Sequence, residues 1–496
     1  MSTFPQSNSI NDIFVYRDSV WLGTEKGLSL ATQHGTSWTN FGGTPPFDTK
    51  GISAFAINDA VLWVATGYNT STNGETVQTG GGFYFTKDRG KTWTYIAQPL
   101  DTAYDLVTIN IDGIPTVFPL DTITYGINRI PSLATTVTQQ NITFDMALTK
   151  NTIWAASWAG MLRQSTDNGT TWHKVVLPSD NLNHIAPTDT LHFYLYPMSG
   201  GLGNYNHLVF SVIAPNDSTL WVGTANGINK STDGGISWTK FNYANQDSSI
   251  SGNWVVALHE QHWSGHSILW ASTQVVDTPE VNGISYTTNG GASWKTALLG
   301  ESIHNFSSQD SMIYAATDDG VFRSIYPFTT WTLNGLISDA FGQITQNAMY
   351  AVAAQGDSVW VGGSDGTALG YNIIDDTTKK VFTATWKLFR AYQHIGTQHT
   401  TYSYPCPFSP GNEFVRLHYS LADRSSTAFV TIRIFDFGML PVKTVIQNVS
   451  RAGGNEYDEL WDGRGDNKKF VANGVYFYRI DIENSDPIWG KVFVIR

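Results

Sequence analysis

Acidic side chains are the residues of this chain with the clearest chemical potential. Hydrolysis of a glycosidic bond needs two carboxylates roughly 5 to 10 Å apart, one to protonate the leaving oxygen and one to attack or to activate water. Asp145 is notable because it interrupts the otherwise apolar segment Ile142–Ala147, although a solvated residue facing a channel explains it equally well. The sequence does not pair the other candidates, which lie between predicted strands: Glu25, Glu75, Asp105, Asp121, Asp189, Asp277, Asp318, Asp319 and Asp365.

Two other clusters raise the question of a metal ion. His259-Glu-Gln-His262, with His266 nearby, is one residue short of the helical zinc-binding spacing and lies in a predicted turn. Asp462, Arg464 and Asp466 follow a Trp in a predicted loop, where the cation favours an ordinary Asp-Gly turn over a calcium site. We therefore expect no metal and no cofactor.

Aromatic and histidine side chains gather in the long segments between predicted strands. Such rings suit contact with a sugar or with an apolar patch on a partner, since they offer area at low entropic cost. The alternative is that they only pack long loops onto a scaffold, because loops of this length need a small core of their own. The candidate ligand-binding residues are Trp158, Tyr104, Tyr125, His192, Tyr194, Tyr196 and Tyr205.

An eight-residue frame recurs along the chain and organises these segments. Its clearest copy is Ser231-Thr-Asp-Gly-Gly-Ile-Ser-Trp238, with a hydroxyl residue first, Asp or Asn third, Gly fifth and Trp eighth. Short polar side chains can bond the backbone of a turn while Gly takes positive φ, and the Trp can anchor a hairpin to the core. The structural residues predicted from the four strong copies are Asp88 and Trp93, Asp167 and Trp172, Asp233 and Trp238, and Asn289 and Trp294.

Each copy follows an apolar strand such as Thr219–Thr224, and two further units keep this strand without the frame. Seven short-stranded units at irregular spacing indicate a radial repeat rather than a solenoid. The frame resembles the Asp-box (BNR) repeat of sialidase-like and photosystem-assembly propellers, and the strands resemble those of two-component-regulator propellers. The resemblance implies an all-β fold with a seven-bladed β-propeller over residues 1–396, which we expect to close without a swapped strand.

The order of strands within a unit sorts the insertions between them. Antiparallel order puts the Asp-box turns at one end of the propeller and the long insertions at the other. We call these ends the box face and the loop face, and we expect function on the loop face, where loops elaborate a rigid scaffold. The long insertions are 68–81, 97–140, 178–206 and 274–282.

A sialidase is the sharpest enzymatic hypothesis, because Arg129-Ile-Pro131 resembles the N-terminal Arg-Ile-Pro of that family. Such an enzyme needs three guanidinium groups converging on the substrate carboxylate. Arg129 is the only arginine before residue 397 that falls in the predicted loop-face insertions. We therefore exclude a sialidase.

The last part of the chain has a different pattern. Residues 397–403 are polar and predict a linker, and residues 404–496 contain alternating strands at the spacing of a small Ig-like antiparallel β-sandwich. This segment resembles the flagellar-hook-capping-like immunoglobulin domain that serves as the C-terminal sorting domain of type IX secretion, with Cys406 in place of the usual Asn. The resemblance implies the type IX secretion machinery as a partner and an extracellular or outer-membrane-surface location.

Composition restricts the partners. The net charge of −12 and the 14% of charged residues argue against nucleic acid and anionic membranes, and no apolar run is long enough for a membrane span. One cysteine excludes an internal disulfide. The segment Met1–Pro5 has no secretory signal pattern, which predicts either a cytoplasmic protein or a chain numbered without its leader.

Two functions remain open from the sequence. The first is a surface propeller, not an enzyme, that binds a glycan or a surface protein through its loop face. The alternative is a surface glycoside hydrolase or lyase acting with loop carboxylates.

Overall fold

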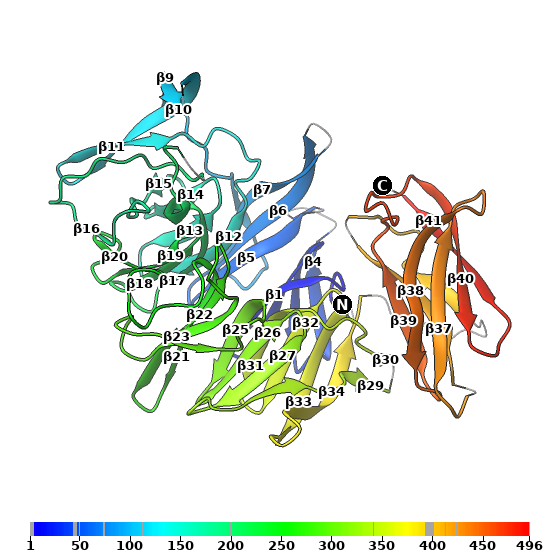
Figure 1. Ribbon diagram of the computed structural model, residues 1–496. Coiled ribbons are helices and arrows are strands. Elements are labelled where there is room, and N and C mark those ends of the chain that lie inside the picture. Colours follow the sequence, from blue (N-terminus) through cyan, green and yellow to red (C-terminus); the bar gives the residue numbers. More distant parts are fainter. Residues whose placement is uncertain are drawn as a thin grey trace.

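The computed structural model (Figure 1) describes residues 4–42, 47–48, 50–72, 75–111, 113–198, 201–340, 342–391, 401–411, 413–422 and 424–495 of the 496-residue chain. In these residues the fold is all-β apart from one short 3₁₀ helix, η1 (Tyr205–His207). A ring of blades forms the larger part, and a β-sandwich lies beside it.

The ring has seven blades, each an antiparallel sheet whose strands run in chain order from the innermost outward. Blades 1 to 4 are β1 (Ile10–Tyr16), β2 (Ser19–Thr24), β3 (Gly27–Thr32), β4 (Ser37–Phe41); β5 (Gly51–Ile57), β6 (Leu62–Thr72), β7 (Glu75–Thr86), β8 (Thr94–Ile96); β12 (Thr143–Leu148), β13 (Ile153–Ser157), β14 (Met161–Ser165), β15 (His173–Lys174); and β17 (Val209–Ile213), β18 (Leu220–Thr224), β19 (Gly227–Ser231), β20 (Trp238–Phe241). Blades 5 to 7 are β21 (Trp254–Trp263), β22 (His266–Gln274), β23 (Gly283–Thr287), β24 (Lys295–Ala297); β25 (Ile303–Gln309), β26 (Met312–Thr317), β27 (Gly320–Ile325), β28 (Trp331–Asn334); and β31 (Met349–Gln355), β32 (Ser358–Gly363), β33 (Gly366–Asp376), β34 (Val381–Phe389).

The ring closes without a swapped strand, as predicted. β1 is the innermost strand of blade 1, where it pairs with β2 and packs between the inner strands β31 and β5. Outer strands add a second link, because β28 of blade 6 pairs in parallel with β34 of blade 7.

Every innermost strand carries a β-bulge near its first residues, at the loop-face end. A bulge leaves one residue unpaired and bends the strand, so it aims that side chain out of the regular ladder. The unpaired residues, in blade order, are Asn11, Ser53, Phe144, Phe210, Val256, His304 and Tyr350.

The repeated turns satisfy their own polar groups. In the turn 231–238, the Asp233 carboxylate accepts hydrogen bonds from the Ser231 hydroxyl (2.8 Å) and from the Ser237 amide (2.9 Å) and hydroxyl (2.6 Å). Asp88 and Asp167 accept the equivalent bonds in their turns, and Asn289 accepts the first two while its amide donates to the Ser293 hydroxyl. Trp238 is fully buried in the core cluster between blades 3 and 4. These turns therefore act as structural anchors.

One polar segment differs from the sequence prediction. Residues 259–262, expected in a turn, belong to β21, and the hairpin reverses at Ser264 and Gly265 instead. The His259 ring is half-buried and bonds the Ser308 hydroxyl at 2.8 Å. The hairpin is longer than the repeat frame suggested because apolar Trp263 packs onto Phe328 in blade 6.

The insertion after blade 2 forms a sheet of its own. β9 (Asp105–Ile111), β10 (Ile114–Tyr125) and β11 (Asn128–Leu133) make an antiparallel meander that projects beside blades 3 and 4 (Figure 1). The insertion 178–206 runs against it and adds β16 (His184–Ile185) to the outer edge of β20. Backbone bonds between Leu195 and both Pro131 and Leu133 hold the two insertions together.

The C-terminal part is a two-sheet sandwich. One sheet contains β35 (Thr401–Tyr404), β36 (Val415–Ser420) and β39 (Glu456–Trp461); the other contains β37 (Ala428–Phe435), β38 (Pro441–Arg451), β40 (Gly474–Ile482) and β41 (Ile488–Val494). A small ribbon, β29 (Ser338–Asp339) with β30 (Gly342–Gln343), lies against β39 from the propeller side. The predicted linker is wrong at residues 401–403, which are in β35 because they pair with β36, while 392–400 lie outside the described residues.

Candidate functional site

The structure does not bring the seven predicted ligand-binding residues into one site. Tyr104 is 44% exposed just before β9, and His192 is exposed on the second insertion. Tyr196 packs edge-on against Phe118, and Tyr194 is half-buried, with its carbonyl bonded to the Asn204 side chain. Of these four residues, Tyr196 links the two insertions through its contact with Phe118.

Tyr125 was expected on the loop face, but it lies at the opposite end. Its hydroxyl donates a 2.6 Å hydrogen bond to the carbonyl of Ile236, inside the turn 231–238. The hairpin of β10 and β11 thus runs down the outside of blade 4. An insertion that starts on one face of a propeller can run along the rim to the other face. The order of strands shows only where the insertion starts.

Trp158 and Tyr205 do come together, in an apolar cluster at the loop-face end of blades 3 to 5. The Trp158 ring lies 5.5 Å from Phe210 and 5.7 Å from Trp254, and Tyr205 packs against the same group. Phe144 joins the cluster through Phe210. The rings mainly contact one another, so the cluster closes the inner end of these blades.

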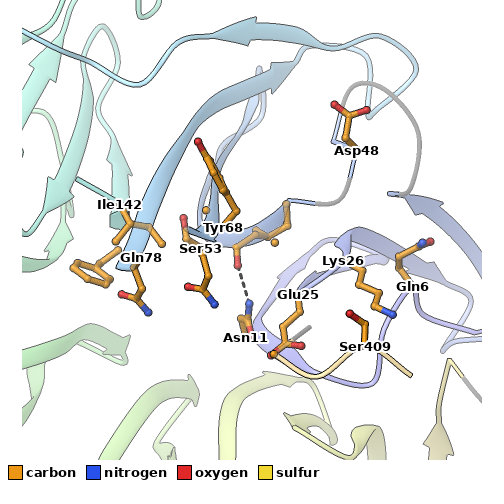
Figure 2. A pocket seen from close by; sticks show the side chains of 16 residues that line it. Gln6, Asn11, Glu25, Lys26, Asp48, Ser53, Tyr68, Gln78, Ile142 and Ser409 are labelled. Carbon is orange, nitrogen blue, oxygen red and sulfur yellow. Dashed lines mark hydrogen bonds between the residues drawn. The ribbon is translucent and has the colours of Figure 1, made fainter. Parts of the chain in front are cut away.

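A large cavity lies on the loop face over blades 1 to 3. It measures about 810 Å³ and is shown in Figure 2. Three of its lining residues, Asn11, Ser53 and Phe144, are the unpaired bulge residues of the first three inner strands. The bulges therefore build the floor of this cavity, which we call the cleft.

One wall of the cleft is the long hairpin of β6 and β7. The predicted loop 68–81 is largely an extension of these strands, in which Tyr68 pairs with Thr79 and Asn69 with Gln78. Tyr68 is 41% exposed, and Asn69 and Gln78 offer amide groups beside it. Gly67 permits the close approach of blade 3, because a Cβ there would lie 2.4 Å from Ile142.

Glu25 and Lys26 come from the turn between β2 and β3 and form the opposite wall (Figure 2). The Glu25 Oε2 atom is buried without a hydrogen-bond partner. Burial, reinforced by the negative charge of Glu413, raises the pKa of Glu25 above its ordinary value, although Ser9 and Lys26 oppose this. Lys26 is ion-paired with Glu413 of the sandwich. The cleft thus combines an exposed aromatic ring, several amides and a carboxyl whose pKa is raised by burial.

The central channel holds a separate pair of acids. Asp145 lines it, as its position in the inner strand suggested, and Asp12 lies on the same lining. Burial raises the pKa of Asp12 to about 6 and that of Asp145 to about 7. The Asp145 oxygens accept the amides of Met146 and Val212, each at 2.8 Å, so this carboxylate ties blade 3 to blade 4.

Among the predicted loop acids, only Glu25 lines the cleft. Asp365 is fully buried between the propeller and the sandwich, where it accepts hydrogen bonds from Arg390 and Arg416. Asp318 pairs with His304 at 2.7 Å. In the part of the chain that the structure describes, no three His, Cys, Asp or Glu side chains are grouped to hold a metal ion, and no helix could span a membrane.

The cleft lies on the loop face, and Glu25 is the one residue of its lining that was predicted from the sequence as a candidate site residue. Tyr68 begins an insertion that was recognised, yet the aromatic set was taken from the longer insertions that follow it. Asn11 and Ser53 could not be recognised from the sequence as cleft residues, because each reaches the cleft only through a β-bulge. The usable signal was Tyr68 itself, an aromatic residue directly after the apolar strand 62–66.

Comparisons with known proteins find matches that include carbohydrate enzymes. No family model matches the chain. The xyloglucanase Xgh74A of Acetivibrio thermocellus is 27% identical over 187 residues, which are 34% of this chain and only 20% of that enzyme. The match therefore spans about a fifth of the curated relative's length.

The matched solved structures include two enzymes of the GH74 type. The GH74 xyloglucanase of Xanthomonas campestris gives a TM-score of 0.48 at 15% identity, covering 84% of this chain and 58% of that one. The GH74 enzyme of Niastella koreensis gives 0.48 at 12% identity, covering 99% and 73%. Both scores are below 0.5, so the assignment of a seven-bladed propeller rests on the sheet topology described above.

Proposed function

We propose that the protein is a surface β-propeller that binds a neutral polysaccharide chain in the cleft over blades 1 to 3. The observation that carries this proposal is the 810 Å³ cleft, in which the half-exposed Tyr68 ring lies beside the amides of Asn69 and Gln78. An aromatic ring flanked by amide donors and acceptors suits a sugar ring with its hydroxyl groups. The net charge of −12 disfavours acidic polysaccharides.

A neutral β-glucan such as xyloglucan is the first ligand to test, because the matched relative is named a xyloglucanase. Calorimetric titration should show binding of xyloglucan oligosaccharides and none of polygalacturonate. Tyr68→Ala should weaken binding about tenfold or more, as removal of a central aromatic contact does. Tyr104→Ala is the matched control, since Tyr104 is similarly exposed but lies on the rim. Equal losses in the two variants would contradict the proposal.

A glycoside hydrolase is the second candidate, favoured by Glu25. A general acid needs a carboxyl that holds its proton near neutral pH, and burial moves Glu25 in that direction. Asp48 lines the same cleft and is the available second carboxylate. Release of new reducing ends from xyloglucan, abolished in Glu25→Gln, would establish the enzyme; binding without release would leave the protein a binding module.

We further propose that the C-terminal sandwich directs export to the cell surface through the type IX secretion machinery. Support comes from the resemblance of residues 404–496 to the sorting domains of that pathway. The test is to locate the full-length chain by surface labelling in the native host and in a strain lacking the translocon. Equal surface labelling in both strains would remove the sorting role.

A further inference from the structure

The cleft is not bounded by the propeller alone. Its lining includes Ser409 and Gly411, which belong to the C-terminal sandwich, and Figure 2 shows Ser409 beside Lys26 at the edge of the cavity. We propose that Ser409, Gly411 and Glu413 form a wall of the carbohydrate site, so the sandwich takes part in ligand binding. This inference rests on the proposed binding of a neutral polysaccharide.

The wall is built as a compact turn. Glu413 holds it from inside, because its Oε1 atom accepts the amide of Ser409 at 2.8 Å and its own amide donates to the Ser409 carbonyl at 3.2 Å. The other carboxylate oxygen pairs with Lys26 of the propeller. One side chain therefore shapes the turn and joins it to the adjacent wall that Glu25 and Lys26 form.

A second contact fixes the sandwich relative to the blades. Arg416 is the second residue of β36, the strand that follows the turn. Its Nε donates a hydrogen bond to the Asp365 carboxylate at 2.8 Å. Arg390, at the end of blade 7, donates to the other oxygen at 2.9 Å. The Asp365 side chain is 0% exposed and that of Arg416 is 1% exposed. This buried ion pair is only a few residues from the wall in the chain. It therefore holds the wall in a defined position relative to the blades.

The position of the wall predicts its role. Ser409 faces the cavity from the side away from the Tyr68 hairpin, so a polysaccharide lying on Tyr68 would pass it. Its neighbours in the cleft, Gln6 and Lys26, supply an amide and a cation that is already neutralised by Glu413. The Ser409 hydroxyl and the Gln6 amide can form hydrogen bonds with sugar hydroxyl groups. The Lys26 charge is already paired, so it does not favour an acidic sugar.

The experiment is a titration of the full-length chain with xyloglucan oligosaccharides. Ser409→Trp places an indole in the cavity and should weaken binding at least tenfold. Ser425→Trp puts the same ring on an exposed loop of the sandwich and should leave affinity within about twofold. Melting temperatures of the two variants, measured beside wild type, report folding.

A measurement on the unmodified protein provides an independent test. Saturating oligosaccharide should slow hydrogen exchange in a peptide that contains Gly411, and leave a peptide that contains Ser425 unchanged. If wild type binds while Ser409→Trp binds equally well and Gly411 is not protected, this inference is overturned and the proposed function stands. If wild type binds no neutral polysaccharide, the proposed function itself fails.

Discussion

Carboxylates in two regions of this molecule have different surroundings. In the central channel, Asp12 and Asp145 are held by backbone amides and one Asn side chain, and burial raises their pKa values to about 6 and about 7. At the junction of the two domains, burial alone would raise the pKa of Asp365, but Arg416 and Arg390 lower it below the ordinary value. Amide donors hold the channel carboxylates in position without lowering their pKa below the ordinary value. At the junction, the guanidinium partners lower the pKa of Asp365 and keep it charged.

The two regions therefore respond to pH in opposite directions. A raised pKa means that the folded state binds protons more readily than the unfolded state, so Asp145 destabilises the fold above pH 7 and stops doing so as pH falls toward 4. A lowered pKa means the reverse. Asp365 stabilises the fold above its unfolded pKa of about 4, and that contribution is lost as pH falls through its lower folded pKa.

The largest expected effect is at the junction. Arg416→Ala removes one of the two guanidinium partners of a fully buried carboxylate, and breaking a buried pair in this way costs about 3–5 kcal/mol. Urea unfolding at pH 7 measures the loss. A loss of unfolding free energy below about 1 kcal/mol would show that water reaches Asp365. The junction would then be solvated in the way that the channel is.

The next effect is the pH dependence produced by Asp145. Between pH 8 and pH 5 its protonation should stabilise the fold by on the order of 2 kcal/mol, since each unit of pKa difference corresponds to about 1.4 kcal/mol. Asp145→Asn should flatten that part of the dependence. Asp365 stays ionised in this window, so it does not obscure the result.

Asp12 should show the same behaviour more weakly. Its pKa of about 6 lies closer to the unfolded value, so the stabilisation between pH 8 and pH 5 should be on the order of 1 kcal/mol. Asp12→Asn also keeps a polar group opposite Asn305. An effect larger than that of Asp145→Asn would mean that Asp12, and not Asp145, has the higher pKa in the folded protein.

The smallest effect should come from the partly exposed pair of Lys26 and Glu413. Their side chains are 29% and 10% exposed, and exposed ion pairs contribute about 0.2–1 kcal/mol. A double-mutant cycle with Lys26→Ala and Glu413→Ala should give a coupling energy in that range. A coupling near that of a buried pair would mean that the cleft excludes water as fully as the junction does.

The sequence predicted features that depend on neighbouring residues and missed those that depend on distant ones. The turn 231–238 was predictable because Ser231, Asp233 and Trp238 interact within eight positions. Seven repeats then predicted the ring, and alternating strands predicted the sandwich. The meander of β9 and β10 was taken as loop because it lies outside the repeat, although its residues alternate.

The junction and the cleft could not be predicted because their residues are far apart in the chain. Asp365 and Arg416 are separated by a domain boundary, and each is unremarkable in its own segment. Glu25 was recognised as a loop acid, but its pKa is raised by burial and by the charge of Glu413, which is far away in the chain. The sequence predicted an independent sandwich, whereas the structure buries an ion pair between the domains.

That buried contact bears on proteolytic maturation. If the proposed sorting role includes removal of the sandwich by a single cut, a protease acting between Ala391 and Thr401 would break the covalent connection. The contacts of Arg416 with Asp365 and of Glu413 with Lys26 involve residues outside that interval and would survive the cut. The two fragments should therefore copurify as a nicked complex at neutral pH, and separation would require acid or denaturant rather than cleavage alone.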